Sequence, residues 1–109
     1  MLYSFQGTPG DGANPYAGVM IGSGGVLYGT TQFGGTTSNG TVFKLTPPAG
    51  VLSGPRGAWT ETLPHNFTGA NGDGATPAAG VAIGKNGALY GTTQFGGTAS
   101  NGTVFKLTP

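Results

Sequence analysis

The sequence predicts an all-β protein that consists of two copies of one antiparallel unit. Residues 1–47 align on residues 63–109 without a gap, and 33 of the 47 aligned pairs are identical. The apolar runs in each copy are short and are separated by glycine-rich turns. No stretch combines the 3.6-residue apolar spacing of a helix with capping residues. A period of this size indicates one supersecondary unit used repeatedly.

Composition excludes several classes of protein. The chain of 109 residues has no Cys and only 6% charged residues, against about a quarter in a typical globular domain. Without Cys there is neither a disulfide framework nor a thiolate metal site. The few charges are scattered, so we expect no nucleic acid and no membrane surface as partner. No apolar run reaches the roughly 18 residues of a membrane span, and the N-terminus carries no signal-peptide pattern.

The first element of each copy is an extended segment. Residues 2–5 form a short one, and residues 59–67 form its longer counterpart. In the longer copy Trp59, Leu63, His65 and Phe67 give a mostly apolar face opposite a polar one, which is the alternation of a half-buried strand. Pro64 cannot donate a ladder hydrogen bond, so this strand belongs at the edge of a sheet.

Three further strands follow in each copy. Residues 16–21 and 78–83 are continuous apolar runs of small residues, which suit a strand buried on both faces. Glycine-rich turns lead to a second strand, predicted over residues 26–33 in the first copy; in the second copy the turn contains Asn86-Gly87, a strong hairpin signal. A turn at residues 38–40 precedes the third strand, residues 41–46. Residues 47–58 show no periodicity and are predicted to be a linker.

A four-stranded meander of this length, with a small apolar inner strand and an outer strand that tolerates proline, is typical of a β-propeller blade. We therefore predict two blades per chain, circularly out of phase. Residues 16–67 form the first blade, with the linker between its third and fourth strands. Residues 78–109 supply three strands of the second blade. Residues 1–6 are the outer strand that completes a blade of a neighbouring chain.

Two blades cannot close a propeller, since about four to eight are needed. A head-to-tail exchange of the outer strand closes into a ring if the rotation between chains fits. We therefore expect a homo-oligomer, either a trimer with six blades or a tetramer with eight. A monomer that folds back on itself and a β-solenoid stack remain the alternatives. Met1 aligns with Leu63 inside the repeat, which leads us to expect an engineered or excised fragment of a longer array.

Three motifs occur once in each copy: Gly-Asp-Gly-Ala-x-Pro from residue 10, Leu-Tyr-Gly-Thr-Thr-x-x-Gly-Gly from residue 27, and Asn-Gly-Thr-Val-Phe-Lys-Leu from residue 39. The chain in this respect resembles the tandem repeats of the GloVer-containing proteins, a bacterial family with many such units and various cell-surface anchoring tails. The resemblance implies a propeller-like repeat protein that is exported in its native setting, while the localisation of this chain stays unknown. It implies no activity, and no catalytic residue can be carried over.

The chemistry-bearing residues do not predict an enzyme. General acid–base catalysis needs titratable groups that converge, and the supply is three carboxylates and one histidine. His65 lies on the apolar side of its strand, where the other copy has Tyr3, and we expect a structural role for it. One histidine without Cys also makes a zinc site within the chain improbable. No cofactor is expected.

Asp11 and Asp73 are the polar pair of most interest, because both stand in the Gly-Asp-Gly-Ala motif. Each carboxylate, together with nearby carbonyl groups, could bind Ca²⁺, which takes six to eight oxygen ligands. The structural alternative is that each accepts hydrogen bonds from amides of its own loop, as in an Asx turn. One carboxylate per loop favours this second interpretation.

Tyr28, Tyr90, Gln32 and Gln94 are the remaining candidates for a weak ligand site. Gln and Thr side chains could line a polar groove for a carbohydrate, with a Tyr ring stacked on the sugar. Structurally, the same rings would fill the space between blades and the Thr residues would form cross-strand ladders. The primary hypothesis is therefore a non-catalytic structural repeat module that self-assembles. A cell-surface module that binds a glycan or peptide through repeated loops is the alternative.

Overall fold

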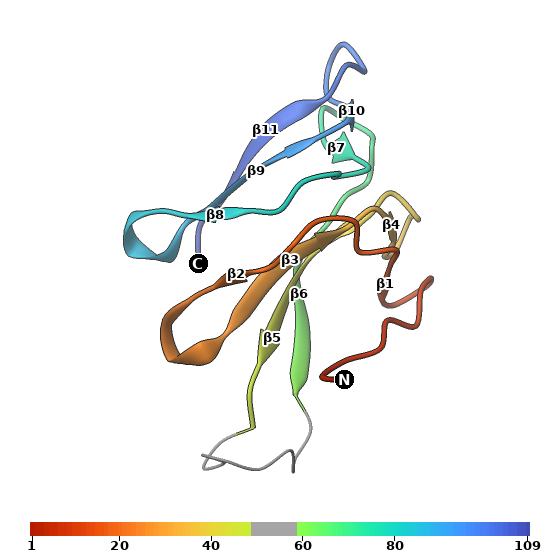
Figure 1. Ribbon diagram of the computed structural model, residues 1–109. Coiled ribbons are helices and arrows are strands. Elements are labelled where there is room, and N and C mark those ends of the chain that lie inside the picture. Colours follow the sequence, from red (N-terminus) through yellow and green to blue (C-terminus); the bar gives the residue numbers. More distant parts are fainter. Residues whose placement is uncertain (49–58) are drawn as a thin grey trace.

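The computed structural model describes residues 1–48 and 59–109, and within them the chain is all-β and antiparallel (Figure 1). This confirms the predicted all-β, antiparallel class. Three strands of the first copy and the opening strand of the second copy form a four-stranded sheet, here called the first sheet. Three later strands of the second copy form a three-stranded second sheet. The first sheet has the order β2 (Met20–Ile21), β3 (Leu27–Thr31), β5 (Thr41–Thr46), β6 (Thr60–Asn66). The second sheet has the order β8 (Ala82–Ile83), β9 (Leu89–Thr93), β11 (Thr103–Leu107).

The turn between the first two strands of each sheet is a single turn of 3₁₀ helix, η1 (Ser23–Gly25) and η2 (Lys85–Gly87). In the second copy Asn86 has φ of 58° and Gly87 has φ of 76°. Positive φ at two successive residues is what a tight hairpin requires, and Asn-Gly adopts it readily. The hairpin predicted at this dipeptide is therefore confirmed.

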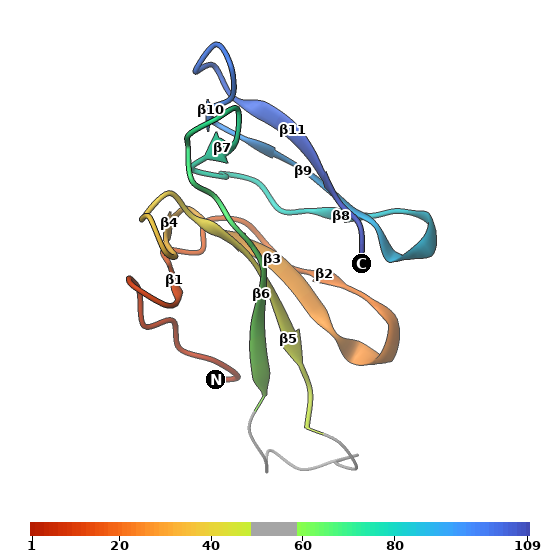
Figure 2. The same ribbon diagram turned by 180° about the vertical axis from the view of Figure 1, so that it is seen from behind.

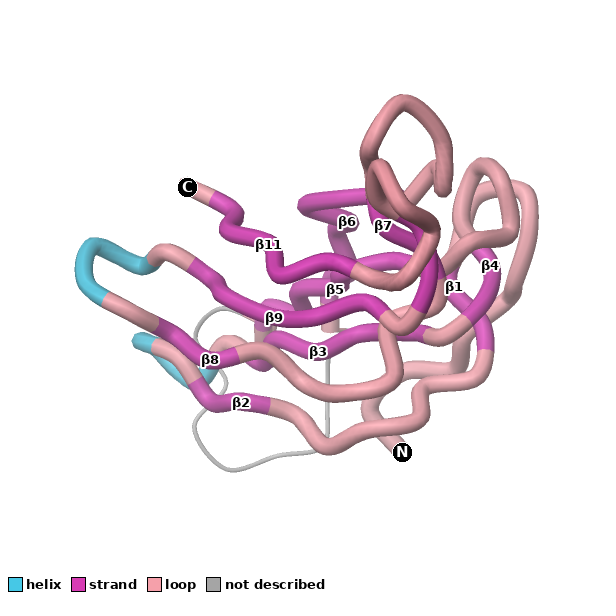
Figure 3. The backbone as a smooth tube through the Cα atoms, turned by 90° about the horizontal axis from the view of Figure 1, so that it is seen from above, coloured by secondary structure: helices cyan, strands magenta, loops and turns pink. Residues whose placement is uncertain are grey.

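Two small sheets were not predicted. β1 (Gly12–Ala13) pairs with β4 (Phe33–Gly34), and β7 (Gly74–Ala75) pairs in the same way with β10 (Phe95–Gly96). They lie at the end of the molecule opposite to the 3₁₀ turns (Figure 3). The second strand, predicted to run to residue 33, is interrupted after Thr31, and Gly34 and Gly35 then both take φ of 82°. Each small sheet fixes the Gly-Asp-Gly-Ala loop against the end of its own repeat.

β6 contains a bulge, and this corrects the face predicted from alternation. Val42 pairs with His65 while Lys44 pairs with Thr62, so β6 has one more residue than β5 between these pairs. An extra residue turns the side chains that follow it to the other side of the sheet. Glu61 and His65, both at odd positions, consequently lie on opposite faces, and the single apolar face was wrong. The predicted edge position of the strand that carries Pro64 is confirmed.

The two sheets pack face to face, one above the other in Figures 1 and 2. Their shared core is one cluster that draws on both repeats and on the segment between them. The buried members are Val42, Phe67, Val81 and Leu89, with Tyr28, Ile83, Phe105 and Leu107 packed against them. Apolar area removed from water here is the main force that joins the repeats.

The apolar run 16–21 was predicted to be buried on both faces, and in the first copy this is wrong. Only Met20 and Ile21 of this run pair as a strand, and Ile21 is 69% exposed. β2 is an edge strand, and no other sheet of the described residues covers its outer side. In the second copy the same run lies against the first sheet, so Val81 is 5% exposed whereas its counterpart Val19 is 52% exposed.

Residues 1–6 pair with no strand of the described chain. They were predicted to join a sheet of a neighbouring chain, and this stays a prediction. They lie beside β6, as Figures 1 and 2 show from both sides. The Phe5 ring packs edge-on against Phe43 with centroids 5.0 Å apart, and Phe67 packs in the same way on Phe105 at 5.2 Å. Residues 1–6 therefore pack on the first sheet in the same way as the end of β6 and Phe67 pack on the second sheet. The predicted linker falls largely outside the described residues.

Candidate functional site: the contact between the repeats

The two faces of each sheet follow from register and alternation. Paired residues share a face, so Tyr28, Thr30, Val42 and Lys44 form the contact face of the first sheet. Ile21, Leu27, Phe43 and Leu45 form its outward face. In the second sheet the assignment reverses. Ile83, Leu89, Phe105 and Leu107 form the contact face, and Tyr90, Thr92, Val104 and Lys106 form the outward face.

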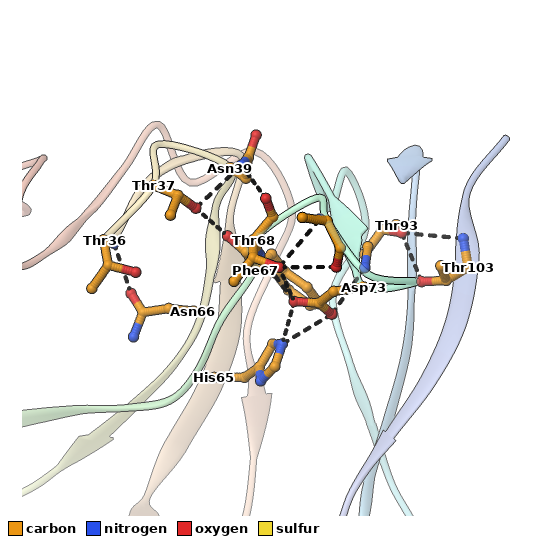
Figure 4. A network of polar contacts seen from close by, with 12 residues as sticks. Thr36, Thr37, Asn39, His65, Asn66, Phe67, Thr68, Asp73, Thr93 and Thr103 are labelled. Atoms are coloured by element: carbon orange, nitrogen blue, oxygen red, sulfur yellow. Dashed lines mark hydrogen bonds and ion pairs between the residues drawn. The ribbon is translucent and has the colours of Figure 1, made fainter. Parts of the chain in front are cut away.

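A polar clasp surrounds this apolar contact. Residues 36–39, the clasp loop, follow the small sheet and reach over the end of β6 (Figure 4). The amide of Thr36 donates to Asn66 Oδ1 at 3.1 Å, Thr37 Oγ1 donates to the Phe67 carbonyl at 2.7 Å, and Asn39 Nδ2 donates to the Thr68 carbonyl at 2.8 Å. The clasp satisfies backbone carbonyls where the chain leaves the first sheet, and so fixes its path to the second.

A second polar link joins the inner strands. Thr30 Oγ1 donates to the Ala79 carbonyl at 2.8 Å, and the Thr30 side chain is 1% exposed. A Cβ added at Gly80 would lie 3.1 Å from the Gly18 carbonyl oxygen. The sheets therefore approach closely at their inner edge, and the small residues predicted for the inner strand permit this approach.

Asp73 sits where the clasped segment turns into the second repeat (Figure 4). Its carboxylate accepts from the Thr68 amide at 2.9 Å, from the Gly74 amide at 2.9 Å and from His65 Nε2 at 3.1 Å. Burial opposes ionisation of this carboxyl, but the Thr68 amide, His65 and the Gly74 amide outweigh it and hold its pKa below the usual range. The side chain thereby ties β6 to the loop of the next repeat.

Asp11 has the same place in the first repeat but different neighbours. It accepts from the Gln6 amide at 2.8 Å, from the Gly12 amide at 2.7 Å and from the Tyr3 hydroxyl at 2.8 Å. The Tyr3 oxygen also lies 3.0 Å from Glu61 Oε1. Burial, together with the Asp11 carboxylate, raises the pKa of Glu61 to about 7. Burial also opposes ionisation of Asp11, but the hydrogen bonds from the Gln6 amide and from the other partners of Asp11 outweigh it and lower the pKa of Asp11. Burial and the two carboxylates raise the pKa of Tyr3.

Both aspartates thus have the loop-amide hydrogen bonds that the structural interpretation of the Gly-Asp-Gly-Ala motif predicts. Among the residues that the structure describes, no three His, Cys, Asp or Glu side chains come together in a way that could hold a metal ion. No helix of the described chain is long and apolar enough to cross a membrane.

The four other candidates lie apart from the aspartates. Tyr28 belongs to the contact face and lines a mostly apolar pocket of about 130 Å³ between the sheets, together with Lys44, Pro64, Leu89 and Leu107. Tyr90 lies on the outward face of the second sheet, with Lys106 Nζ 5.7 Å from its ring centroid. Gln32 and Gln94 lie near the small sheets, where the backbone N–H of Gln32 donates to the Asn14 carbonyl at 3.0 Å and that of Gln94 donates to the Thr76 carbonyl at 3.1 Å. The structure does not bring these four side chains together.

Comparison with known families gives one finding. The model of the Gloeobacter/Verrucomicrobia repeat matches residues 1–109. The chain belongs to this repeat family. The match confirms the resemblance predicted from the three motifs. Comparisons with curated proteins and with solved structures gave no match.

Within this member of the Gloeobacter/Verrucomicrobia repeat family, the unit that the sequence repeats occurs in two different surroundings. Val42 on the contact face of the first sheet is 0% exposed, and Val104, the same residue of the next repeat, is 82% exposed. Thr30 and its partner Thr92 differ in the same way, the first buried and the second exposed. The outward face of the second sheet is therefore a second copy of a surface that the first repeat buries.

Sequence reasoning missed the clasp and the role of Glu61. The clasp depends on Asn39 and Asn66, which lie 27 positions apart, and no spacing rule connects them. Glu61 was noted only as one of three scattered acids. One signal in the sequence pointed toward the clasp: Asn-Gly-Thr-Val-Phe recurs at residues 39 and 101. From the sequence alone, this motif predicts only a turn followed by a strand.

Proposed function

We propose that the chain is a non-catalytic structural repeat module whose sheets are propeller blades, and that copies assemble head to tail. The observation that carries the proposal is the difference between Val42, 0% exposed, and Val104, 82% exposed. A β-branched apolar residue in mid-strand, repeated with its neighbours Tyr90 and Thr92, gives the outward face the composition of the buried contact. A second copy that packs as the second sheet packs on the first would remove this face from water.

The complementary surface lies on the other side of the molecule. Ile21 and Leu27 on the outward face of the first sheet are the counterparts of Ile83 and Leu89, which already meet a contact face within the chain. The two outward faces are thus the two halves of the internal contact. Such a contact is heterologous, so it adds chains in one direction and closes when the rotation fits. Three chains would give six blades, and four would give eight.

The same relation supports the proposal that residues 1–6 are the outer strand of a blade in the neighbouring chain. β5 pairs Thr41 with Asn66 and Val42 with His65. Shifted by one repeat, Thr103 of one copy pairs with Ser4 of the next, and Val104 pairs with Tyr3. The segment would then be the outer strand predicted from the sequence, while Phe5 keeps the packing on Phe43 that it has within its own chain.

Light scattering after size exclusion, over a hundredfold range of concentration, tests the assembly. We expect one mass, three or four times 10.7 kDa, that does not change with concentration. Val104→Asp should give a 10.7 kDa monomer that keeps the β-sheet circular-dichroism spectrum of the wild type, because this side chain makes no buried contact within the chain. Val42→Asp is the matched change at the buried position and should unfold the chain. A wild-type mass of 10.7 kDa at every concentration would refute the proposal.

One observation favours the alternative function, a cell-surface module that binds a glycan or peptide. Phe33 and Phe95 are 45% and 53% exposed beside Gln32 and Gln94, so both repeats present an aromatic ring next to an amide at the same end of the molecule. Exposed rings and amides suit a sugar, and repetition would add avidity to weak sites. A glycan array that gives signals for the wild type and none for the Phe33→Ser, Phe95→Ser double variant would support it.

A further inference from the structure

The open edge of β11 is the feature that carries a further inference, because the first repeat shows what covers it. Among the described residues β11 pairs only with β9, whereas β5, its counterpart, pairs with both β3 and β6. The strand that closes β5 has an exposed face and a partly buried one, and it carries Glu61 opposite Leu45. The pairing of β6 with β5 therefore indicates the length, register and side chains of a strand that would pair with the open edge of β11.

The clasp loop of the second repeat is the second part of this acceptor site. Residues 98–101 correspond to residues 36–39, and Asn101 has the place of Asn39. Within the described chain the Asn101 side chain makes no bond like that of Asn39 to the Thr68 carbonyl. Ala99 stands where the first repeat has Thr37, so one of the three clasp bonds would be missing. An incoming segment with asparagine at the register of Asn66 would still receive the Thr98 amide.

The third part is a basic residue that the first repeat does not have. In the first repeat Glu61 of the outer strand meets Tyr3, whose hydroxyl is bonded to Asp11. In the second repeat His65 takes the place of Tyr3, and its Nε2 is bonded to Asp73. An outer strand on β11 therefore brings its glutamate to an imidazole. A ring N–H of the imidazole can donate to this carboxylate, as the Tyr3 hydroxyl does in the first repeat.

We infer that the β11 edge, residues 98–101 and His65 together form an acceptor for an extended acidic strand of the β6 type. The partner is a segment with glutamate opposite Leu107 and asparagine opposite Thr103, a pattern that residues 59–69 of this chain show against β5. The inference rests on the proposed function, since both assume that the contacts between the two repeats of this chain form again between the second repeat and another molecule. It differs in naming an occupant that residues 1–6 cannot fully replace, because they reach only the first part of β11 and carry no carboxylate.

A labelled peptide of residues 59–69 and its Glu61→Gln version test the inference by fluorescence anisotropy. The chain is used whole, as wild type and as Ile21→Asp, which places a charge on the outward face of the first sheet and leaves β11 untouched. Gly18→Ala serves as a second variant if Ile21→Asp fails to fold. We expect the Ile21→Asp chain, whose β11 edge is open, to bind the acidic peptide, and to bind the Gln peptide about three- to tenfold more weakly, as for the loss of a hydrogen bond to a partly buried carboxylate. In the assembled wild type residues 1–6 would cover the first part of β11, so the wild type should bind the acidic peptide more weakly than Ile21→Asp does.

His65→Tyr supplies the decisive comparison, because Tyr is the residue of the first repeat at this place. With this change made in the Ile21→Asp chain, the preference for the Glu peptide over the Gln peptide should disappear while binding persists. Equal affinities of the two peptides for Ile21→Asp itself would overturn the role of His65. Absence of binding to Ile21→Asp would overturn the acceptor itself. The proposed function fails separately, through a monomeric wild type, since peptide binding to the monomeric variant does not require chains to associate.

Discussion

At the level of single residues, the equivalent aspartates of the two repeats have different side-chain partners. Asp11 and Asp73 hold the same loop amides, but the first faces the Tyr3 hydroxyl and the second faces His65. The Tyr3 hydroxyl has one proton and stands between two carboxyls, at 2.8 Å from Asp11 and 3.0 Å from Glu61. It can donate to only one of them. When it donates to Asp11, a proton on Glu61 completes the chain of hydrogen bonds, and the buried Glu61 Oε2, which has no partner among the described atoms, is then uncharged.

Glu61→Gln should therefore change how stability depends on pH. The pKa of Glu61 is raised from 4.5 to about 7, so between these values the folded chain binds more protons than the unfolded chain. The free energy of unfolding then falls as pH rises through this interval. Gln keeps the shape and a donor but cannot ionise. Melting temperatures measured from pH 4 to pH 8 should be closest for variant and wild type at pH 4, with the variant increasingly the more stable toward pH 8.

Asp73→Asn is the control for this measurement, since the pKa of Asp73 is lowered rather than raised. Its carboxylate stabilises the fold above the unfolded pKa, and this contribution is lost as pH falls through the folded pKa. The variant should be less stable than the wild type at neutral pH, with the difference narrowing in acid. A difference between Glu61→Gln and wild type that stays constant with pH would contradict the assignment to Glu61.

At the level of elements, the sequence predicts the order of strands well and their faces less well. The meander β2–β3–β5–β6, the Asn86-Gly87 hairpin and the edge position of Pro64 all follow from local pattern and turn chemistry. The bulge in β6 does not, because an extra residue in a strand leaves no mark in alternation until the partner's register is known. The small sheets were missed because two-residue strands carry no periodicity. The acceptor site joins residues that only the register and the sheet packing bring together.

Gly29→Ala tests how closely the strands of one sheet pack. Gly29 pairs directly with Phe43, and an added Cβ would lie 2.5 Å from a carbon of that ring. Phe43 is held between the sheet and Phe5, so the ring has little room to move. We expect a loss of about 1–3 kcal/mol in the free energy of unfolding, typical of overpacking, measured by urea denaturation. Gly10→Ala, where a Cβ meets nothing within 4 Å, should change stability little; equal effects would refute the packing argument.

At the level of the whole molecule, substitutions at two equivalent glycines would allow the stability of the single chain and the stability of an assembly to be measured separately. A Cβ at Gly80 would lie 3.1 Å from the Gly18 carbonyl, and a Cβ at Gly18 meets nothing within 4 Å. Gly80→Ala should thus lower the melting temperature of the chain by forcing its two sheets apart. Gly18→Ala should leave that temperature unchanged for the monomer.

In a head-to-tail assembly, however, Gly18 of each copy stands where Gly80 stands now. Gly18→Ala should then weaken association, seen as a mass in light scattering that becomes dependent on concentration. If Gly18→Ala leaves the oligomer intact and as resistant to dilution as the wild type, copies do not meet through the contact that joins the repeats.

The exposed outward face has a consequence for how such proteins change length. Because each unit carries both halves of the contact, inserting or deleting a whole unit creates no surface that was not already there. Residues 27–47 and 89–109 differ at a single position, so recombination between the coding segments could add or remove units without disturbing a single packing contact. An open array of any length still keeps two outward faces in water, one at each end. Only a closed ring removes them, and selection against aggregation would therefore act on the number of units that closes the ring.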